Sequence, residues 1–370
     1  MKGGPSQQAL IQPDREQVRR VIARHGWNVC SCQIDSPGIL HWLAPCGDAA
    51  VGYVTRARTH VVAGAPICRP EHLGHVAQEW EQISASMGRR VCYFGAMQPL
   101  CTQLVTKGTH SAIACGALPI WKPDRWCHNL NGNRELKAQL RRARNSGVTV
   151  CEWTAERAMH SNSLWECHRD WRSRHRMAPM AFVSGTAGIS ELRDKRLFVA
   201  LQGEQVVAFL LMIPIPARKG WMSELFPRRH TAPNGSVELL VHHAITAAHS
   251  SGSNMFTLGF SPLSTSKLSN TPANPPWVQA AFRFAQTRCM PYNFAGLERF
   301  KQKFRPEAWE PVYCISSEAN FSIRSAAVTL CAFTEKQYLS TVVRHAMACR
   351  TRQIAGNLRL KTNLDNGSRT

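Results

Sequence analysis

The sequence predicts an α+β protein with two domains and mixed, mostly antiparallel sheets. Segments whose apolar residues repeat every 3.6 positions alternate with short apolar runs typical of strands, as far as about residue 315. Two of these runs flank "QGEQ" at 202–205, which is the pattern of a β-hairpin. A chain of 370 residues is also too long for one small core, because domains usually contain ~100–200 residues.

The first domain is expected over residues 14–127, after a disordered start at 1–13. It opens with "DREQVRRVIARHG", which has helical spacing, and three strand-like pieces follow: "ILHWLAP", "AAVGYVTRARTHVVAGAP" and "RRVCYFGAM". Between the last two, "PEHLGHVAQEWEQISASMG" repeats its apolar residues at helical spacing.

The second domain is expected over residues 128–315. A basic helix, "NLNGNRELKAQLRRARNSG", ends at Gly147, and "SNSLWECHRDWRSRH" predicts another helix. The hairpin comes next, then a strand over 221–226, a helix, and a strand in "NMFTLGFSPL" (254–263). This order of meander, helix and strand is typical of an N-acyltransferase-like mixed sheet, in which a bulge or splay opens a cleft where the helix begins. Both halves share a helix that leads into a meander and a further helix, so we expect a structural duplication.

The loop "APNGSVELL" marks the start of the helix in the second domain. Pro233, Asn234 and Gly235 interrupt the preceding strand, and Ser236 is expected to cap the helix. Backbone N–H groups at such an end suit an anion, with phosphate as the obvious candidate. The alternative is an ordinary helix entry, because every helix needs some N-terminal cap.

The charge of the chain predicts a polyanionic partner. Lysine and arginine number 45 against 24 aspartate and glutamate residues, which gives a formal charge of +21 and a pI near 9.9. Nucleic acid or an anionic lipid surface would match this excess, and binding would depend strongly on salt. No apolar run approaches ~18 residues, and the N-terminus lacks an apolar signal region, so we expect neither a membrane span nor secretion.

The 14 cysteines predict a reduced, cytoplasmic protein with no disulfide framework and no metal site. Cys30 and Cys32 form a CxC pair, not CxxC, and Cys127-His128 and Cys167-His168 lack a second spaced pair.

The stretch "NFAGLERFKQKFRPEAWEPVY" (293–313) interleaves basic and aromatic residues, a pattern that suits phosphate or nucleic-acid contact as well as it suits a solvated face. We expect a strand there, with Lys301 and Lys303 on opposite sides, one in the cleft and one in water. Glu224, between apolar residues of a strand, would need a cationic partner if buried, and this lysine-rich stretch could supply one. Glu238 in the first turn of the helix complements the helix dipole.

Histidines offer a weaker source of a general base. His230 lies in the loop and stays a candidate proton acceptor, whereas His242 and His243 on the helix are expected to be surface or packing residues. No GxSxG motif supports a serine nucleophile.

Five segments carry a resemblance to a known family: "ELKAQLRRARNSGVTV", "MGRRVCYFG", "APNGSVELL", "FTLGFSPLS" and "NFAGLERFKQKFRPEAWEPVY". With them, residues 15–315 resemble the C-terminal catalytic domain of the aminoacyl-phosphatidylglycerol synthases, also called phosphatidylglycerol lysyltransferases. The resemblance implies tandem GNAT-like (acetyltransferase-like) domains that move an aminoacyl group from aminoacyl-tRNA onto a hydroxyl, typically of phosphatidylglycerol. The family's acid before the PNG loop maps onto Glu224, where Asp is common, and its essential lysine maps onto Lys303 or Lys301. An arginine common three positions after the acid is replaced by Pro227, with Arg228 adjacent.

Aminoacyl-tRNA is already an activated ester, so we expect no cofactor. In this interpretation Glu224 holds the donor's α-ammonium or orients Lys303, and Lys303 stabilises the oxyanion or the departing ribose oxygen. The amides of Asn234, Gly235 and Ser236 would bind phosphate. Further substrate contacts are expected from Arg228, Glu238, Arg299 and His230, and tRNA contacts from Arg141, Arg142 and Arg144, although a solvated helix face explains these last three equally well.

Several alternatives stay open. An acetyl-CoA-dependent acetyltransferase would need a glycine-rich phosphate loop that "APNGSVELL" does not match. The same donor could serve a small-molecule, sterol or peptide acceptor, and a non-catalytic protein that binds RNA or membrane could keep the fold. Family members often carry a multi-helix flippase region that is not seen in this sequence, so a lipid acceptor would require a protein peripheral to the inner membrane face. Residues 316–370 are expected to form a basic helical tail, either a packing helix or one that lies on anionic lipid.

Overall fold

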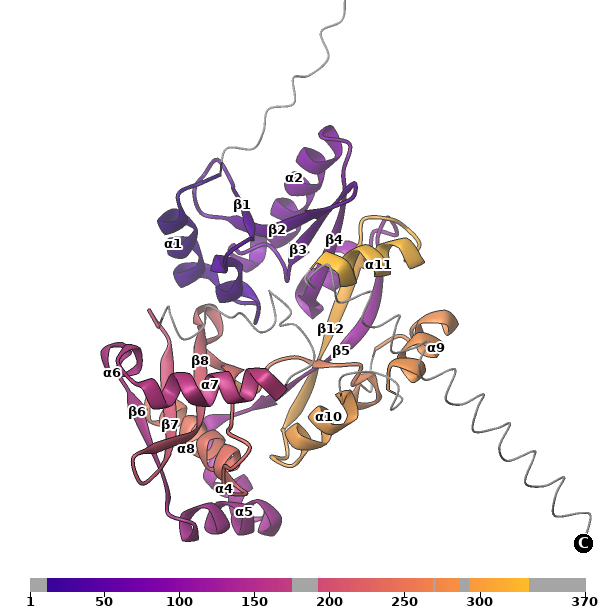
Figure 1. Cartoon of the computed structure of the whole chain (residues 1–370). Helices are drawn as coiled ribbons and strands as arrows, with labels where there is room; N and C mark the ends of the chain where they lie inside the picture. Colours follow the sequence, from indigo (N-terminus) through magenta and orange to yellow (C-terminus); the bar gives the residue numbers. More distant parts are fainter. Residues whose placement is uncertain (1–11, 175–191, 269–270, 287–292, 333–370) are drawn as a thin grey trace, which may run out of the picture.

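The computed structural model describes residues 12–174, 192–268, 271–286 and 293–332 (Figure 1). The N-terminal half contains, in order, α1 (Arg15–His25), η1 (Ser31–Asp35), β1 (Leu40–Leu43), β2 (Ala50–Arg56), β3 (Thr59–Ala63), η2 (Pro70–His72), α2 (Leu73–Ser86), β4 (Arg90–Met97), α3 (Gln98–Val105), β5 (Ser111–Trp121) and η3 (Pro123–Arg125). The C-terminal half contains α4 (Trp126–Asn131), α5 (Arg134–Asn145), β6 (Val148–Trp153), α6 (Ala155–Met159), α7 (Asn162–Arg174), β7 (Arg196–Gln202), β8 (Gln205–Ile215), η4 (Pro216–Arg218), β9 (Gly220–Leu225), α8 (Ser236–Ser250), β10 (Met255–Thr257), β11 (Ser261–Pro262), η5 (Thr265–Lys267), α9 (Pro276–Ala285), α10 (Phe294–Gln302), β12 (Ala308–Ser316) and α11 (Ile323–Ala332).

One sheet runs through both halves in the order β1-β2-β3-β4-β12-β5-β10-β9-β8-β7-β6, with β11 paired to β5. The described strand pairs are antiparallel except β3–β4 and β9–β10, which α2 and α8 connect as crossovers. Each half therefore repeats a meander, a helix and a parallel strand, as the suspected duplication requires. The α+β class with a mixed, mostly antiparallel sheet is confirmed.

The two halves exchange a strand at the centre of the sheet. β5 follows β4 in the chain but pairs with β10 of the other half, and β12 follows the second half but lies between β4 and β5 (Figure 1). The sheet is thus continuous across the predicted boundary at 127/128, and β12 lies with the first-half strands although the prediction placed it in residues 128–315. The division into two domains at this point stays a prediction.

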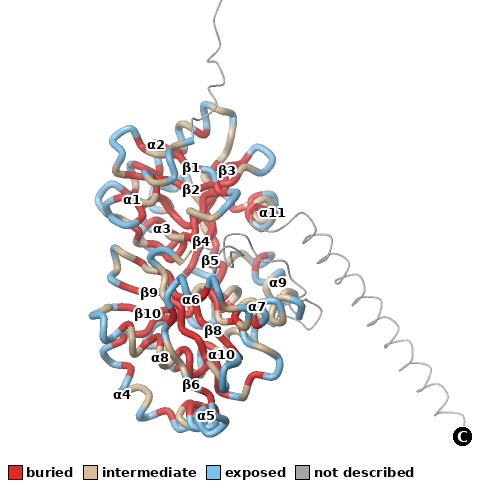
Figure 2. Tube along the Cα trace, turned by 60° about the vertical axis from the view of Figure 1, so that its left-hand side comes forward, coloured by how far each residue is buried: buried red, intermediate tan, exposed pale blue. Residues whose placement is uncertain are grey.

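Helices cover both faces of the sheet, and the buried residues follow the strands between them (Figure 2). In the second half, alternate residues of β7 and β8 pack on α5 and α8 from one face and on α6 and α7 from the other. In the first half α1 and α11 cover one face, and α2 and α3 cover the other. Strand alternation sends successive side chains to opposite layers, so both cores come from one sheet.

The structure corrects several local expectations. The predicted basic helix at 129–147 is two helices, α4 and α5, separated at Gly132 and capped anew by Asn133, whose side chain accepts a hydrogen bond from the Leu136 amide. The expected strand at 254–263 is two short strands, because Gly259 adopts a φ of 75° between them. Of the predicted tail at 316–370, α11 packs on β2, β3 and β4, and residues 333–370 lie outside the described residues.

Helix α8 begins through a close contact with α5, not through a serine cap. Gly235 is the N-terminal cap with a φ of 91°, and the hydroxyl of Ser236 donates to the Pro233 carbonyl at 2.7 Å. The expected Ser236 cap is therefore wrong. A Cβ on Gly235 would lie 2.1 Å from the carbonyl oxygen of Gln139, so both backbone angle and space require glycine.

The loop glycine gives a stability prediction with an internal control. Gly252, beyond the other end of α8, has a φ of 70°, but no heavy atom lies within 4 Å of the position that a Cβ would take there. Gly252→Ala should lower the free energy of unfolding by roughly 1–2 kcal/mol, the cost of a left-handed backbone. Gly235→Ala should lower it by roughly 2–5 kcal/mol, because the Gln139 contact adds overpacking. Equal decreases in urea denaturation would contradict a close contact between α5 and α8.

Candidate functional site

A cavity of about 860 Å³ opens between the two halves where β9 and β10 separate. The parallel pairing runs from Gly220–Met255 to Met222–Thr257 and then stops, although β9 continues to Leu225. Both strand continuations line the cavity, with η1 and β4 on the first-half side and α5, α7, α8 and α10 on the other. The expected splay at the start of the helix is therefore present.

A β-bulge in β9 places two consecutive polar side chains at this cavity. Met212 of β8 pairs with Ser223, and Leu211 pairs with Leu225, so Glu224 is the extra residue. Ser223 and Glu224 both belong to the residues that line the cavity, as do their neighbours Met222, Leu225 and Phe226. Bulges commonly re-aim side chains beside active sites.

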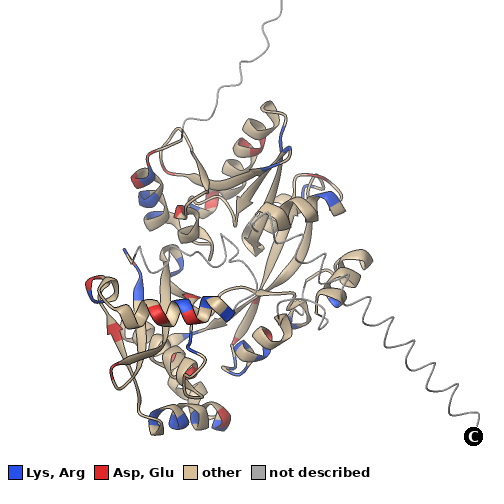
Figure 3. Ribbon diagram, in the orientation of Figure 1, with Lys and Arg blue, Asp and Glu red and all other residues tan. Residues whose placement is uncertain are grey.

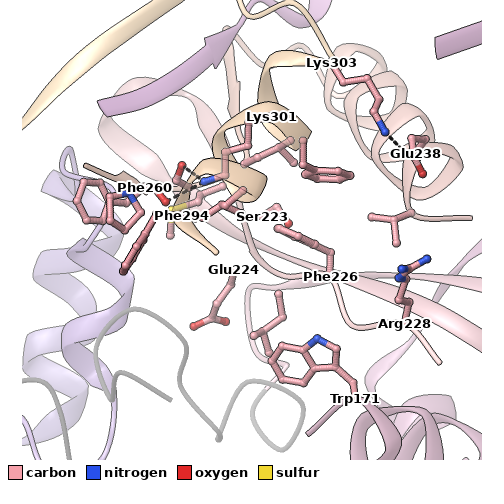
Figure 4. Close-up of a pocket in the computed structure, with 18 of the residues that line it drawn as sticks. Trp171, Ser223, Glu224, Phe226, Arg228, Glu238, Phe260, Phe294, Lys301 and Lys303 are labelled. Carbon is pink, nitrogen blue, oxygen red and sulfur yellow. Dashed lines mark hydrogen bonds and ion pairs between the residues drawn. The ribbon is translucent and has the colours of Figure 1, made fainter. Parts of the chain in front are cut away.

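Lys301 is buried at the back of the cavity, with 1% of its surface exposed. Its amine donates to the carbonyl oxygens of Gly259 and Phe260, both at 2.8 Å (Figure 4). These carbonyls follow β10, where the strand pairing has ended. No carboxylate approaches this amine among the described residues, and burial lowers the pKa of Lys301 from 10.5 to about 7.

Lys303 forms an ion pair with Glu238 at the N-terminus of α8, with 2.8 Å between Nζ and Oε1 (Figure 4). Its ammonium also lies 5.6 Å from the ring centre of Phe300. Lys301 and Lys303 both line the cavity, and the predicted strand over them is wrong: they lie in α10 and at its C-terminal cap. The apolar residues Leu297, Phe300 and Phe304 recur at helical spacing, a signal that the basic residues between them obscured.

Glu224 points into the cavity (Figure 4), with 5% of its side chain exposed. Its Oε2 lies 3.4 Å from Nζ of Lys195. The expected cation from the late lysine-rich stretch is not its partner in the described residues, because Lys303 is held by Glu238 on the other side. Lys195 lies just before β7 and carried no motif that sequence reasoning could have used.

The cavity has a cationic end and an apolar end. Lysine and arginine side chains follow α5, α7 and α10 (Figure 3). Arg142, Arg172 and Arg228 line the cavity at α5, α7 and the loop after β9, and the guanidinium of Arg228 has no partner among the described residues. The other end is lined by Val29, Phe94, Phe260, Pro262, Phe294, Leu297 and Val312.

The remaining predicted residues fall in different places. Asn234, Gly235 and Glu238 line the cavity, whereas Ser236 is buried with 1% exposure and does not. Arg299 lines a second hollow of about 660 Å³ beside α10, which shares Lys303 with the first. His230 lies outside both hollows, with Nδ1 3.1 Å from Asp170 Oδ1.

The three arginines of α5 that were expected to contact tRNA lie in different surroundings. Arg142 lines the cavity, and Arg141 and Arg144 are exposed outside it. His242 accepts a hydrogen bond from the indole of Trp126, and burial lowers its pKa to about 4, with the neighbouring His243 and Arg144 adding to the effect.

Ser223 is the site residue that sequence reasoning missed. The residue lines the cavity, and its buried hydroxyl has no hydrogen-bond partner in the described part of the chain. A buried polar group without a partner costs free energy unless a ligand or water satisfies it.

The cysteines do not contribute a metal centre in the described residues, where no group of three or more His, Cys, Asp or Glu side chains is arranged to hold an ion. Cys30 lines the cavity, and burial raises the pKa of its thiol far above the usual range. Burial also raises the pKa of Cys32 to about 12, so neither thiol is a ready nucleophile. None of the described helices could span a bilayer, since none is both long and apolar enough.

The sequence profile of the family described as "Phosphatidylglycerol lysyltransferase, C-terminal" matches residues 36–316. The bifunctional lysylphosphatidylglycerol biosynthesis protein LysX of Mycolicibacterium gilvum (strain PYR-GCK) is 25% identical over 340 residues, which are 88% of this chain and 30% of that protein. The phosphatidylglycerol lysyltransferase of Bacillus subtilis (strain 168) is 32% identical over 111 residues, 30% of this chain and 12% of that protein. The chain therefore spans about a third or less of the length of these relatives.

Among solved structures, L-PGS from Bacillus licheniformis superposes with a TM-score of 0.72 at 21% sequence identity, over 88% of this chain and 96% of that one. The two chains share their fold.

The buried amine predicts a pH-dependent stability. Lys301 binds a proton more weakly in the folded state, at a pKa of about 7, than in the unfolded state, at 10.5. Between these values the unfolded chain holds more protons, so stability decreases as pH falls. The free energy of unfolding of the native protein, relative to Lys301→Met, should rise by roughly 1.4 kcal/mol per pH unit between pH 7 and 9.

Urea denaturation of both proteins across this pH range measures the difference, and groups that titrate alike in the two proteins cancel. A difference that does not change with pH would mean that Lys301 keeps its proton in the folded state.

Proposed function

Because the chain belongs to the phosphatidylglycerol lysyltransferase C-terminal family, we propose that it transfers an aminoacyl group from aminoacyl-tRNA to the headgroup hydroxyl of phosphatidylglycerol. In this reaction the ester bond between the amino acid and the tRNA ribose breaks, and a new ester bond to the lipid hydroxyl forms. The hydroxyl proton leaves for the departing ribose oxygen. No external energy source is needed, because one ester replaces another.

The observation that carries this proposal is the shared cavity, which combines a buried amine, two carboxylate–lysine pairs and an orphan hydroxyl with one cationic and one apolar end. Aminoacyl transfer needs three kinds of group: a carboxylate that binds the ammonium of the donor, a base that accepts a proton, and hydrogen-bond donors that stabilise an oxyanion. All three kinds of group line the same cavity, whose cationic end suits phosphates and whose apolar end suits lipid.

Lys301 is the best candidate for moving the proton. As a neutral amine it would use its two N–H groups on the carbonyls of Gly259 and Phe260 and keep a lone pair for a hydroxyl proton. A pKa of about 7 is close to the operating pH, where a general base is most effective.

Lys303 keeps the role of oxyanion stabiliser, since its ion pair with Glu238 holds the ammonium at the cavity wall. Glu224 receives the α-ammonium of the donor, and Ser223 donates its unpartnered hydroxyl to a substrate oxygen. Arg228, together with the amides around Asn234 and Gly235, would face phosphate.

The donor would approach over the basic surface of α5, α7 and α10. Arg142 lines the cavity, Arg141 and Arg144 are exposed outside it, and Arg299 lies by the second hollow. Phosphate neutralisation by such side chains gives strong, salt-sensitive binding.

The acceptor would come from an anionic lipid surface to which the protein binds peripherally. Trp277 of α9 and Ile323 of α11 are exposed by 36% and 70%. The segment from Lys267 to Leu297, which contains Trp277, has no aspartate or glutamate.

Transfer to lipid is tested with a pool of radiolabelled aminoacyl-tRNAs and a total lipid extract, followed by extraction into the organic phase. Native protein should move label into lipid. Lys301→Met and Lys303→Ala should lower the rate ~100-fold or more, because proton transfer and oxyanion stabilisation are removed. Glu224→Gln should also be impaired, because it loses the charge that attracts the ammonium.

Two other outcomes separate the alternatives. Label that enters only a water-soluble product would point to a small-molecule acceptor. RNA binding without any product would make the chain a binding module.

The tRNA surface is tested by salt titration. The slope of log K against log salt concentration should become shallower by roughly 0.7–0.9 for each phosphate that the protein no longer neutralises. The combined Arg141→Ala, Arg142→Ala and Arg144→Ala variant should show this change, whereas Arg58→Ala, exposed in the first half, should keep the native slope. An unchanged slope in the triple variant would exclude α5 from the tRNA surface.

A further inference from the structure

Both carboxylates that line the main cavity already have a lysine partner. Glu224 pairs with Lys195 at 3.4 Å, and Glu238 pairs with Lys303 at 2.8 Å. The Glu224 side chain is 5% exposed and that of Lys195 is 21% exposed, so this pair is largely shielded from water. Shielded charges interact more strongly than charges in bulk water.

The other charged groups of the cavity wall are cationic. Among the described residues that line it, they are Arg142, Arg172, Arg174, Arg228 and Lys301. Arg174 is held by Asp170, which lies outside the lining, at 2.8 Å. The wall therefore offers a ligand more positive than negative charge.

An aminoacyl ester brings one ammonium at its α-carbon, and a lysyl or arginyl ester brings a second positive charge on its side chain. The contact of Glu224 with Lys195 uses Oε2, and Oε1 receives no hydrogen bond from the described residues. One carboxylate oxygen is thus left for the α-ammonium. A second cation would have to displace Lys195 or lie against like charge, and both are unfavourable.

The walls near Glu224 suit an uncharged side chain. Trp171 of α7 and Phe226 after β9 line the cavity beside Glu224, and Phe260 and Phe294 line its apolar end (Figure 4). Aromatic walls stabilise apolar groups by burial, whereas a charged side chain would lose its hydration there, and the described lining residues offer it no unpaired carboxylate.

We propose that the aminoacyl group that this protein transfers has an uncharged side chain, and that Lys195 enforces this choice by occupying Glu224. This inference rests on the proposed aminoacyl transfer and names its substrate class. The ester exchanged is the same as above, so the selection acts on binding and adds no chemical step.

The test separates the amino acid from the tRNA body. One tRNA is acylated by a ribozyme with lysine, with norleucine, which has the lysine chain without its ammonium, or with alanine. Each is given to the native protein with phosphatidylglycerol vesicles, and the initial rate of label transfer into lipid is measured. Norleucyl and alanyl transfer should exceed lysyl transfer by about 10- to 100-fold, the size expected for an uncompensated charged contact.

The variant Lys195→Met tests whether Lys195 causes the selection against a charged aminoacyl side chain. Removal of this ammonium leaves both oxygens of Glu224 for substrate, so the ratio of lysyl to norleucyl transfer should rise by about 10-fold or more. Lys267→Met is the matched control, because Lys267 pairs with Glu298 at 3.8 Å outside the cavity lining. It should keep the native ratio.

The outcomes are distinct. Equal or faster lysyl transfer by the native protein overturns the selection but keeps the proposed function. A ratio unchanged in a folded Lys195→Met variant overturns the role of Lys195. Absence of transfer from all three esters overturns the proposed function, and the inference with it. If Lys195→Met does not fold, the comparison of the three esters on native protein still decides the selection.

Discussion

The crevice depends on the hydrogen bonds between the buried amine of Lys301 and the carbonyl oxygens of Gly259 and Phe260. These carbonyls follow β10, where the pairing with β9 has ended, and a buried carbonyl without a donor is costly. The amine satisfies both carbonyls and lets the strands stay apart. Its own burial weakens proton binding, so the environment that satisfies these carbonyls also favours the neutral form of the amine.

The position of Lys301 depends in turn on the exchange of strands between the halves. Helix α10 ends at Gln302, and β12 begins at Ala308 and pairs with β4 and β5. The short connection ties the helix to the centre of the sheet, opposite the bulge of β9. Gly259 and Lys301 both belong to the second half, but β12, the strand that follows α10, pairs with the first-half strands β4 and β5. The position of α10 is therefore coupled to the assembly of the whole sheet.

Hydrophobic periodicity predicted the helices and the hairpin because it reflects local burial, and the family motifs identified Glu224, Lys301 and Lys303 as candidate site residues. Neither signal identified Ser223 or Lys195. Ser223 carries no motif, although it lies beside the bulge of β9, and Lys195 meets Glu224 through tertiary packing. The helical period at Leu297, Phe300 and Phe304 was readable, but the alternating basic residues of "RFKQKFR" suggested a strand.

The pairing of each cavity carboxylate with a lysine has a physical rationale in the proposed reaction. Both substrates carry phosphodiester groups, which a bare carboxylate would repel, yet the α-ammonium of the donor needs a carboxylate to bind. A glutamate beside a lysine presents little net charge at the distance of a phosphate but still offers an oxygen at hydrogen-bond range. The arginines of the cavity wall can then attract the phosphates without competing repulsion from the carboxylates. A cavity that served a substrate with two ammonium groups would need a further carboxylate that lacks such a partner, and the described lining residues contain none.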